Sequence, residues 1–408
     1  MVTVLAALAA LIWLYLFVVH GRPLINGDTA KRGHSFWRLG QPLAPVGTVD
    51  QWPGVAIIIP ARNEVATVWP VVRAHLATRY PGPVDLTVID DHSTDGTSDL
   101  ARAAAGADPR FSLTAPPPLP AGWSGKLWAL HHGIKTVQAR AQKPDFILLT
   151  DADIVHAPDT LTRLVTHAVT QKSVMVSLMA RLDSRGVWGG LLMPAFVYFF
   201  MQLYPFARVN EARDPLGGAA GGCLLVRTER LMAIGGVAAI RDALIDDCAL
   251  AHRLKNNAPR ASIFLALARD DIKSLRDNRS LRSIWQMVSR TAYTQLRYNP
   301  GFLILTVIGL AIVYVLPITI LISGLWGMAV AKTAIIFALI SSGLMSVSFW
   351  PVLSLYKKSP LQALTLPVAA LFYAMMTVHS AIQHWRGRGG TWKGRTYDQG
   401  VTHSSSVP

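Results

Sequence analysis

Apolar residues are concentrated near the two ends of the chain, while the middle alternates between apolar and polar stretches. An uncharged apolar run covers Val2–Val19, and three more runs cover roughly Phe302–Val330, Thr333–Val352 and Leu361–Ile382. Each run is long enough for a helix to cross the hydrocarbon core of a bilayer. The pattern predicts a multi-pass membrane protein with a globular domain between the first and second runs.

The first run predicts a retained anchor rather than a cleaved signal peptide. It lacks a basic leader, and no small-residue cleavage site precedes His20. The chain is therefore expected to comprise an N-terminal transmembrane anchor (1–22), a globular domain (50–298), a C-terminal transmembrane region (301–384) and a basic cytoplasmic tail (385–408).

Short β-branched runs alternate with helical stretches in the first half of the globular domain. The expected strands are Val55–Ile59, which stops at Pro60, then Asp85–Ile89, Phe146–Leu149 and Ser173–Met179. Helices are expected between them, over Val65–Thr78 and Trp128–Ala141. Such alternation predicts an α/β, Rossmann-like domain with a mostly parallel sheet. Ligands bind such sheets at the carboxyl ends of the strands.

Another apolar and aromatic stretch, Val187–Phe206, lies inside the globular domain and contains Pro194 and Pro205. We expect an interfacial or re-entrant helix here, because a full crossing would place Asp153 and Asp247 on opposite sides of the bilayer.

The net positive charge of the chain bears on whether its partner is nucleic acid or a membrane. The 408 residues carry a net charge of +15, yet only 15% are charged and the mean hydropathy is +0.33. The basic residues form no stripe interleaved with aromatic residues, so we expect no nucleic acid partner. Basic residues beside the apolar runs favour the cytoplasmic side and anionic headgroups. Cys223 and Cys248 lack metal-ligand spacing and are expected to be small buried residues.

Acidic residues follow two of the expected strands. Asp151-Ala152-Asp153 comes directly after Phe146–Leu149 and Thr150. Its carboxylates are hard oxygen ligands for Mg²⁺ or Mn²⁺, which can neutralise a leaving diphosphate. A solvated aspartate turn is the alternative reading. Asp90 and Asp91 follow the second strand and can accept hydrogen bonds from uracil or ribose; turn and cap formation is the alternative there.

Two further groups suit transfer chemistry. Lys126 stands at a loop-to-helix junction, where it can contact a diphosphate together with helix N-terminal amides. Asp246 and Asp247 precede a helical stretch, and a carboxylate there can take a proton from an attacking hydroxyl. We choose Asp247 as this general base and keep Asp246 as a further candidate. The alternative is an acidic pair that complements the helix dipole.

As a set, these motifs resemble family 2 glycosyltransferases of the GT-A fold. The segments that carry the resemblance are Pro60-Ala61-Arg62-Asn63-Glu64, Asp90–Thr97, Gly125-Lys126 with Ala129, Asp151-Ala152-Asp153, and Asp246-Asp247 with Leu250. The resemblance implies nucleotide binding by Asp90 or Asp91, metal binding by Asp153 and the base role of Asp247. Pro60, Arg62, Glu64, Lys126 and Asp151 are assigned to the donor site with them.

Within this family the chain is similar to the hopanoid-biosynthesis-associated type, through Pro116–Leu130, the single anchor and the tail from Trp392 to Tyr397. Membrane members usually carry Gln-x-x-Arg-Trp. The nearest matches here are Gln286-Met287-Val288-Ser289-Arg290-Thr291 and Gln295-Leu296-Arg297-Tyr298, and neither fits. The tryptophan is missing, and Arg290 remains a candidate site residue. The departure favours a single transfer onto a lipid over processive polymer synthesis.

The expected function is inverting, metal-dependent transfer from a UDP-sugar to a membrane lipid, either a hopanoid or another polyisoprenoid, in a bacterial inner membrane. The alternatives are a ceramide-glucosyltransferase-like glycolipid synthase, a polysaccharide synthase, a phosphoryl or nucleotidyl transferase, and a non-catalytic membrane scaffold.

A cytoplasmic domain followed by three spans would leave Arg386, Arg388, Lys393 and Arg395 outside, against the positive-inside rule. We therefore expect either a re-entrant run or a run that turns back near Pro317.

Overall fold

The computed structural model describes residues 1–22, 35–257, 261–387, 391–392 and 395–396. Most of the expected basic tail (385–408) lies outside these residues. The chain forms two compact units. The helical unit comprises Met1–Pro42, Leu182–Leu216 and Asp277–Ala381; the sheet unit comprises Leu43–Arg181, Gly217–Arg276 and the described residues from Ile382 onward.

The sheet unit is built on seven strands in the order β3-β2-β1-β4-β7-β6-β8. Strand β1 pairs parallel with β2 and with β4, β2 pairs parallel with β3, and β6 pairs parallel with β8. Strand β7 pairs antiparallel with both of its neighbours, β4 and β6. The mostly parallel sheet expected from the sequence is therefore confirmed. The strands are β1 (Val55–Ala61), β2 (Val84–Asp90), β3 (Phe111–Thr114), β4 (Phe146–Leu149), β6 (Met175–Met179), β7 (Leu224–Arg227) and β8 (Ile263–Leu267). Two short pairs lie outside it, β5 (Ile154–His156) with β9 (Ile272–Ser274), and β10 (Thr391–Trp392) with β11 (Arg395–Thr396).

Strand β1 differs from the expectation at its end. The sequence predicts a stop at Pro60, but β1 continues to Ala61, where it pairs with Asp90 of β2. On the other side, pairing with β4 ends at Ile58. A proline is tolerated at this position because the ladder that would need its missing N–H has already ended.

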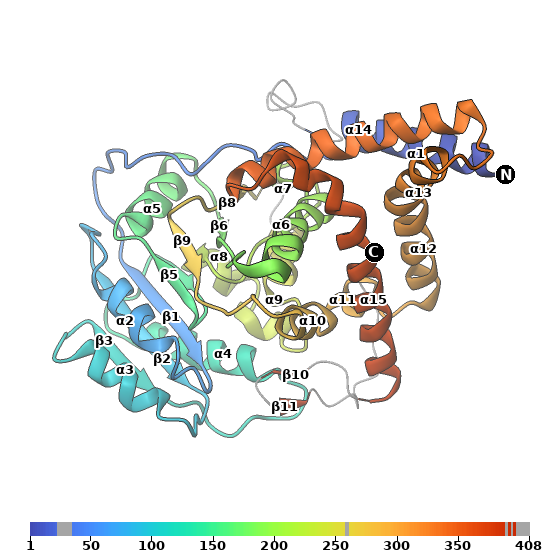
Figure 1. Cartoon of the computed structure of the whole chain (residues 1–408). Helices are drawn as coiled ribbons and strands as arrows, with labels where there is room; N and C mark the ends of the chain where they lie inside the picture. The colour runs from blue at the N-terminus through green and yellow to red at the C-terminus, as the bar shows by residue number, and fades with distance from the viewer. Residues whose placement is uncertain (23–34, 258–260, 388–390, 393–394, 397–408) are drawn as a thin grey trace. The chain divides into compact units, whose positions relative to one another are not determined.

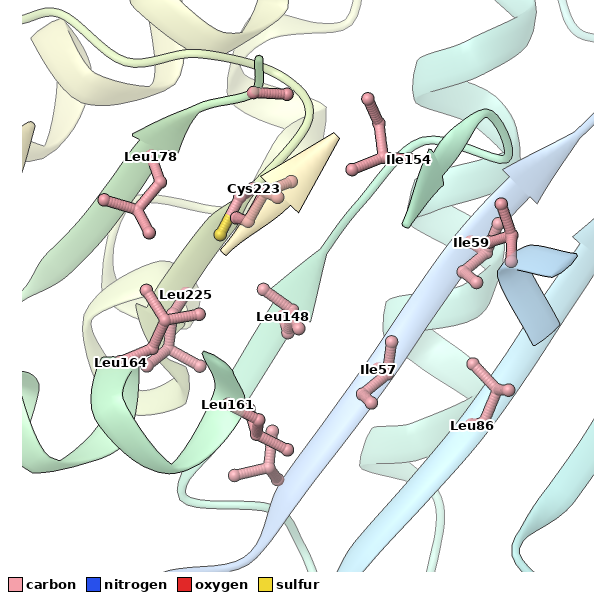
Figure 2. Close-up of a cluster of buried hydrophobic side chains, with 14 of the residues drawn as sticks. Ile57, Ile59, Leu86, Leu148, Ile154, Leu161, Leu164, Leu178, Cys223 and Leu225 are labelled. Carbon is pink, nitrogen blue, oxygen red and sulfur yellow. The ribbon is translucent and has the colours of Figure 1, made fainter. Parts of the chain in front are cut away.

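Helices cover both faces of the sheet. They are α2 (Val68–Leu76), α3 (Thr97–Ala105), α4 (Gly125–Gln138), α5 (Thr160–Thr170), α8 (Thr228–Ala233), η2 (Gly236–Ile240) and α9 (Asp246–Asn257). One core includes side chains of α2, α3 and α5. Figure 2 shows Leu161 and Leu164 of α5 in this core together with Ile57 of β1 and Leu148 of β4. Helix α4 packs on the opposite face, where Gly133 lies against Ile58. Each buried Leu or Ile side chain stabilises the fold by about 1.5–3 kcal/mol.

The helical unit contains the long apolar helices. They are α1 (Val2–Val18), α6 (Gly186–Leu203), α7 (Phe206–Val209), α10 (Leu281–Ser289), α11 (Ala292–Gln295), α12 (Pro300–Leu310), η3 (Ala311–Val315), α13 (Leu316–Leu325), α14 (Lys332–Leu355), η4 (Pro360–Thr365) and α15 (Leu366–Trp385). Helix α1 lies along α14 (Figure 1). Within the described residues, four helices are long and apolar enough to cross a membrane: Gly186–Leu203, Pro300–Leu325, Lys332–Leu355 and Pro360–Trp385. Helix α1 is shorter, at 17 residues.

The run at Pro317 continues as one helix of 26 residues from Pro300 to Leu325, so the expected turn-back at this proline is wrong. Pro317 has no N–H to offer the carbonyl of Val313, four residues earlier. The helix widens into a π-turn at Ala311–Val315, and the buried indole of Trp13 donates to the Val313 carbonyl at 2.7 Å. A tryptophan of α1 thus supplies a hydrogen bond that the proline cannot.

Candidate active site

The strand order brings the predicted acidic residues to one edge of the sheet. Strands β1, β2 and β4 are parallel neighbours, so the segments after Ala61, Asp90 and Leu149 leave the sheet at the same edge. Strand β7 runs the other way, with Leu224 opposite Leu149. The glycine run before β7 is therefore brought beside the loop that begins at Thr150, whose hydroxyl donates to the Gly222 carbonyl at 2.8 Å.

Lys126 is the centre of the charged groups at this edge. Its ammonium lies 2.9 Å from Asp151 Oδ1 and 3.0 Å from Asp246 Oδ2. Ser124 caps the start of α4 by accepting a hydrogen bond from the Leu127 N–H at 3.2 Å, which fixes Lys126 in the first helical turn. Burial alone would lower the pKa of Lys126, but the carboxylates of Asp151 and Asp246 raise it well above its usual value. The lysine is therefore charged at neutral pH.

Asp247 is held beside this pair by backbone donors. Its Oδ2 accepts from the Gly221 N–H at 2.7 Å, and its Oδ1 accepts from the Cys248 N–H at 2.7 Å. Burial, followed by the carboxylate of Asp246, raises the pKa of Asp247 to about 6, while Lys126 opposes this rise. A carboxylate with this pKa is ionised at neutral pH yet more basic than an ordinary aspartate, as a general base requires.

Asp153 lies on the same loop as Asp151, and its carbonyl accepts from the Leu275 N–H at 2.7 Å. Burial, followed by the carboxylates of Asp151 and Glu64, raises the pKa of Asp153 to about 6; Arg276 and Lys126 lower it. Glu64 was predicted from its motif alone, and the structure places its charge near Asp153. Arg276 was not predicted as a site residue; its position after β9 becomes visible only once β9 pairs with β5.

Asp90 and Asp91, by contrast, are tied into the turn that follows β2. The Asp90 carboxylate accepts from Ser93 N at 2.9 Å, from Ser93 Oγ at 2.5 Å, and from the Ser98 hydroxyl. Asp91 is buried, and Arg62 Nη1 lies 3.6 Å from its Oδ2. The turn-forming reading therefore accounts for the observed contacts of Asp90, while nucleotide binding by either residue remains a prediction.

The remaining candidates separate into two groups. Pro60 lines a small pocket with Lys126, Asp151 and Asp246; the other lining residues are Leu130, Leu149, Thr150, Gly221 and Leu224. Arg290 instead follows α10 in the helical unit, so its role remains a prediction.

Two glycines of the run before β7 shape the site. A Cβ on Gly217 would lie 2.4 Å from the backbone N and Cα of His252, so only glycine lets this loop pass so close to α9. A Cβ on Gly221 would lie 3.4 Å from Asp247 Oδ2, 3.5 Å from Lys126 Nζ and 3.7 Å from Asp151 Oδ2. Gly221 is thus a point on which three charged groups converge.

The carboxylates suit a divalent cation whose coordination shell is completed by a bound ligand. Among the described residues, no group of three or more His, Cys, Asp and Glu side chains is placed to hold a metal on its own. Mg²⁺ commonly takes one or two protein carboxylates together with substrate phosphates. Asp153, with its oxygen donors and the acidic neighbours Asp151 and Glu64, fits this arrangement.

Comparisons with known proteins agree with the fold. The profile described as "Glycosyltransferase like family 2" matches residues 53–290. An N-acetylglucosaminyltransferase of Mesorhizobium japonicum is 31% identical over 118 residues, which cover 28% of this chain and 26% of that protein. The chain thus matches about a quarter of the length of this relative.

Among solved structures, the mannosyltransferase PcManGT from Pyrobaculum calidifontis, in complex with GDP-Man and Mn²⁺, is similar with a TM-score of 0.57 and 17% identity. The superposition covers 94% of this chain and 99% of that chain. This similarity concerns the fold, and it confirms the expected GT-A type of architecture. Because the profile match spans more than half of the 408 residues, the chain belongs to the glycosyltransferase-like family 2.

Proposed function

We propose that this protein is a membrane-bound glycosyltransferase that moves a sugar from a nucleotide-diphosphate sugar, a UDP-sugar, to a lipid acceptor. The observation that carries the proposal is the convergence of Lys126, Asp151, Asp246 and Asp247 beside Gly221 at the carboxyl edge of the sheet. It combines a cation for a diphosphate, carboxylates for a metal and a basic carboxylate for an acceptor hydroxyl.

The proposed reaction is a single displacement with inversion. Asp247 takes the proton of the acceptor hydroxyl, and the hydroxyl oxygen forms a bond to the anomeric carbon. The bond from that carbon to the diphosphate breaks on the opposite side, and its electron pair leaves with the nucleoside diphosphate. Lys126 and the first amides of α4 stabilise the charge that develops on the diphosphate.

Asp153, supported by Asp151, is the proposed protein ligand of Mg²⁺ or Mn²⁺. When bound, the metal ion would supply Lewis-acid stabilisation of the leaving diphosphate. Glu64 and Arg276 act on Asp153 through their charges and are proposed to tune its affinity for the metal.

The four candidate spans support a lipid acceptor, and we propose a hopanoid or another polyisoprenoid. A ceramide-like lipid remains the second candidate. Such a lipid would present a hydroxyl group at the membrane surface, and a hydroxyl is the group that the proposed general base deprotonates. The absence of tryptophan after Arg290 supports one transfer per acceptor rather than polymer synthesis.

The sheet topology supports a re-entrant or in-plane α6. The strands before α6 (β4, β6) and the strand after it (β7) hydrogen-bond to one another in one sheet. A single crossing by α6 would separate them across the bilayer. We propose that α6 returns to its side of entry, that 1–22 anchors the chain and that the sheet unit is cytoplasmic in a bacterial inner membrane.

The test is product analysis with the purified full-length protein in lipid nanodiscs, using UDP-sugars labelled in the sugar and hydroxylated polyisoprenoid lipids. We expect label in the lipid fraction, an equal amount of released UDP and an inverted anomeric configuration. Label in the lipid with release of UMP instead of UDP would indicate a phosphoryl transferase, and labelled sugar 1-phosphate with an unlabelled lipid would indicate a nucleotidyl transferase. Failure to bind UDP with Mn²⁺ would favour a non-catalytic scaffold.

A further inference from the structure

The position of Lys126 in its helix calls for a counter-charge. It occupies the first turn of α4, where the helix dipole disfavours a cation. The structure provides two counter-charges, Asp151 from the loop after β4 and Asp246 from the start of α9. These segments are far apart in the sequence, so the lysine links two separate elements of the site.

The ion pairs are shielded from solvent. The exposed fraction is 19% for the Lys126 side chain, 17% for Asp246 and 34% for Asp151. Ion pairs at the open surface contribute little, but partial burial lowers the effective dielectric constant and strengthens the attraction. Lys126 therefore neutralises much of the negative charge that would otherwise attract a divalent cation.

The same ammonium lies where a diphosphate is expected. The N-terminus of α4 offers backbone N–H groups that attract an anion, and a bound diphosphate would give Lys126 a new counter-charge. Asp151 stands two residues before Asp153, so releasing Asp151 from Lys126 would raise the negative charge next to the proposed metal ligand.

Building on the proposed function, we infer that Lys126 is an internal counter-cation of the donor-free site. Its ammonium holds Asp151 and Asp246 together and opposes metal binding until a nucleoside diphosphate replaces these carboxylates as its partner. Metal and donor would then bind together rather than in sequence. The ion pair between Lys126 and Asp246 would then depend on whether the donor site is occupied. Asp246 lies on α9, the helix that also carries Asp247.

The decisive experiment measures Mn²⁺ binding without nucleotide, using the full-length protein in nanodiscs and isothermal titration. We expect Lys126→Met to bind Mn²⁺ about tenfold more tightly than the wild type, and to bind UDP in the presence of Mn²⁺ about tenfold more weakly. A residue with only a structural role would not move these two affinities in opposite directions. Lys126→Arg, which keeps the charge, should retain the low affinity for Mn²⁺ alone.

Lys135 provides the matched control, because it is an exposed lysine on the same helix. Lys135→Met should leave both affinities at the wild-type level. If Lys126→Met does not fold, Lys126→Gln carries the same expectation, because it can hydrogen-bond to both carboxylates without a charge.

Unchanged or weaker Mn²⁺ binding by the uncharged variants would overturn the inference. The titration needs neither sugar nor acceptor, so its outcome is separate from that of the proposed function. Tighter Mn²⁺ binding in Lys126→Met together with no sugar transfer by the wild type would remove only the proposed function.

Discussion

The two compact units use buried polar groups in different ways. In the sheet unit, the polar groups of the site stand at strand ends and helix starts, where charges such as Lys126 and Asp246 meet. In the helical unit, buried polar side chains reach backbone carbonyls of apolar helices: Trp13 donates to Val313, and Tyr373 donates to Leu192 at 2.8 Å. The buried polar groups therefore form ion pairs at the candidate site in one unit and hold helices together in the other.

This difference explains why site residues at strand ends can be predicted from the sequence and contacts between helices cannot. A motif at a strand end is read locally, because the period of the strand fixes where its last residues point. A contact between helices depends on which faces meet, and a uniformly apolar helix gives no sign of this. Substitutions in each unit can test this difference.

Asp247→Asn should separate chemistry from fold in the sheet unit. The amide oxygen can still accept from a backbone N–H, but it cannot take a proton at neutral pH. We expect turnover to fall about 10²–10⁴-fold, with UDP binding close to the wild-type level. Turnover and UDP binding are measured on the same preparation. Asp242→Asn, at an exposed aspartate before α9, is the control and should remain active; normal turnover in Asp247→Asn would remove this residue as the base.

A buried histidine pair should make the sheet unit sensitive to acid. His75 and His156 lie with ring centroids 4.6 Å apart. Burial lowers the pKa of His156 from 6.5 to about 4 and also lowers the pKa of His75. Because the folded state resists protonation, stability is full above the unfolded pKa of 6.5 and is lost as the pH falls towards the folded value.

The expected contribution of His156 to this loss is about 3 kcal/mol between pH 7 and pH 4. The free energy of unfolding is measured by chemical denaturation at each pH, with the fluorescence of tryptophans in the sheet unit as the signal. His156→Leu should lose less stability on acidification than the wild type. An equal loss in both proteins would show that other groups dominate the acid response.

Trp13→Phe tests the helical unit. Phenylalanine keeps an aromatic ring at this position but has no N–H. The Val313 carbonyl therefore loses its donor in a segment where Pro317 supplies none. We expect a loss of about 1–3 kcal/mol, seen as a lower unfolding temperature in nanodiscs, with UDP binding unchanged. Trp326→Phe, at an 84% exposed tryptophan, should have no effect. If both variants were equally stable, the indole hydrogen bond would not hold α1 to the π-turn.

Some strands could be predicted from the sequence and others could not. β1, β2, β4 and β6 were predicted within a few residues, because each is a β-branched or apolar run ended by polar residues. β3, β5, β8 and β9 were missed, since they are short or lack such boundaries. The long apolar helices were predicted by length, but the continuation through Pro317 was not, because Trp13 stabilises it from far away in the sequence.

The site was predicted as a list of residues but not as an arrangement. Lys126 was expected to face a diphosphate, and its pairing with Asp151 and Asp246 follows only from the packing of α4 and α9. The convergence of three charged groups on Gly221 was not predicted, because it depends on the antiparallel pairing of β7 with β4.

Two helix caps give the finest comparison between the units. Ser124 caps α4 in the sheet unit and Ser280 caps α10 in the helical unit, where it accepts from the Ser283 N–H at 3.1 Å. Replacing either serine with alanine should cost about 0.5–2 kcal/mol, measured by thermal unfolding. Only Ser124→Ala should also weaken UDP binding, because α4 positions Lys126. Equal effects of the two variants on UDP binding would mean that the cap acts through general stability and not through the lysine.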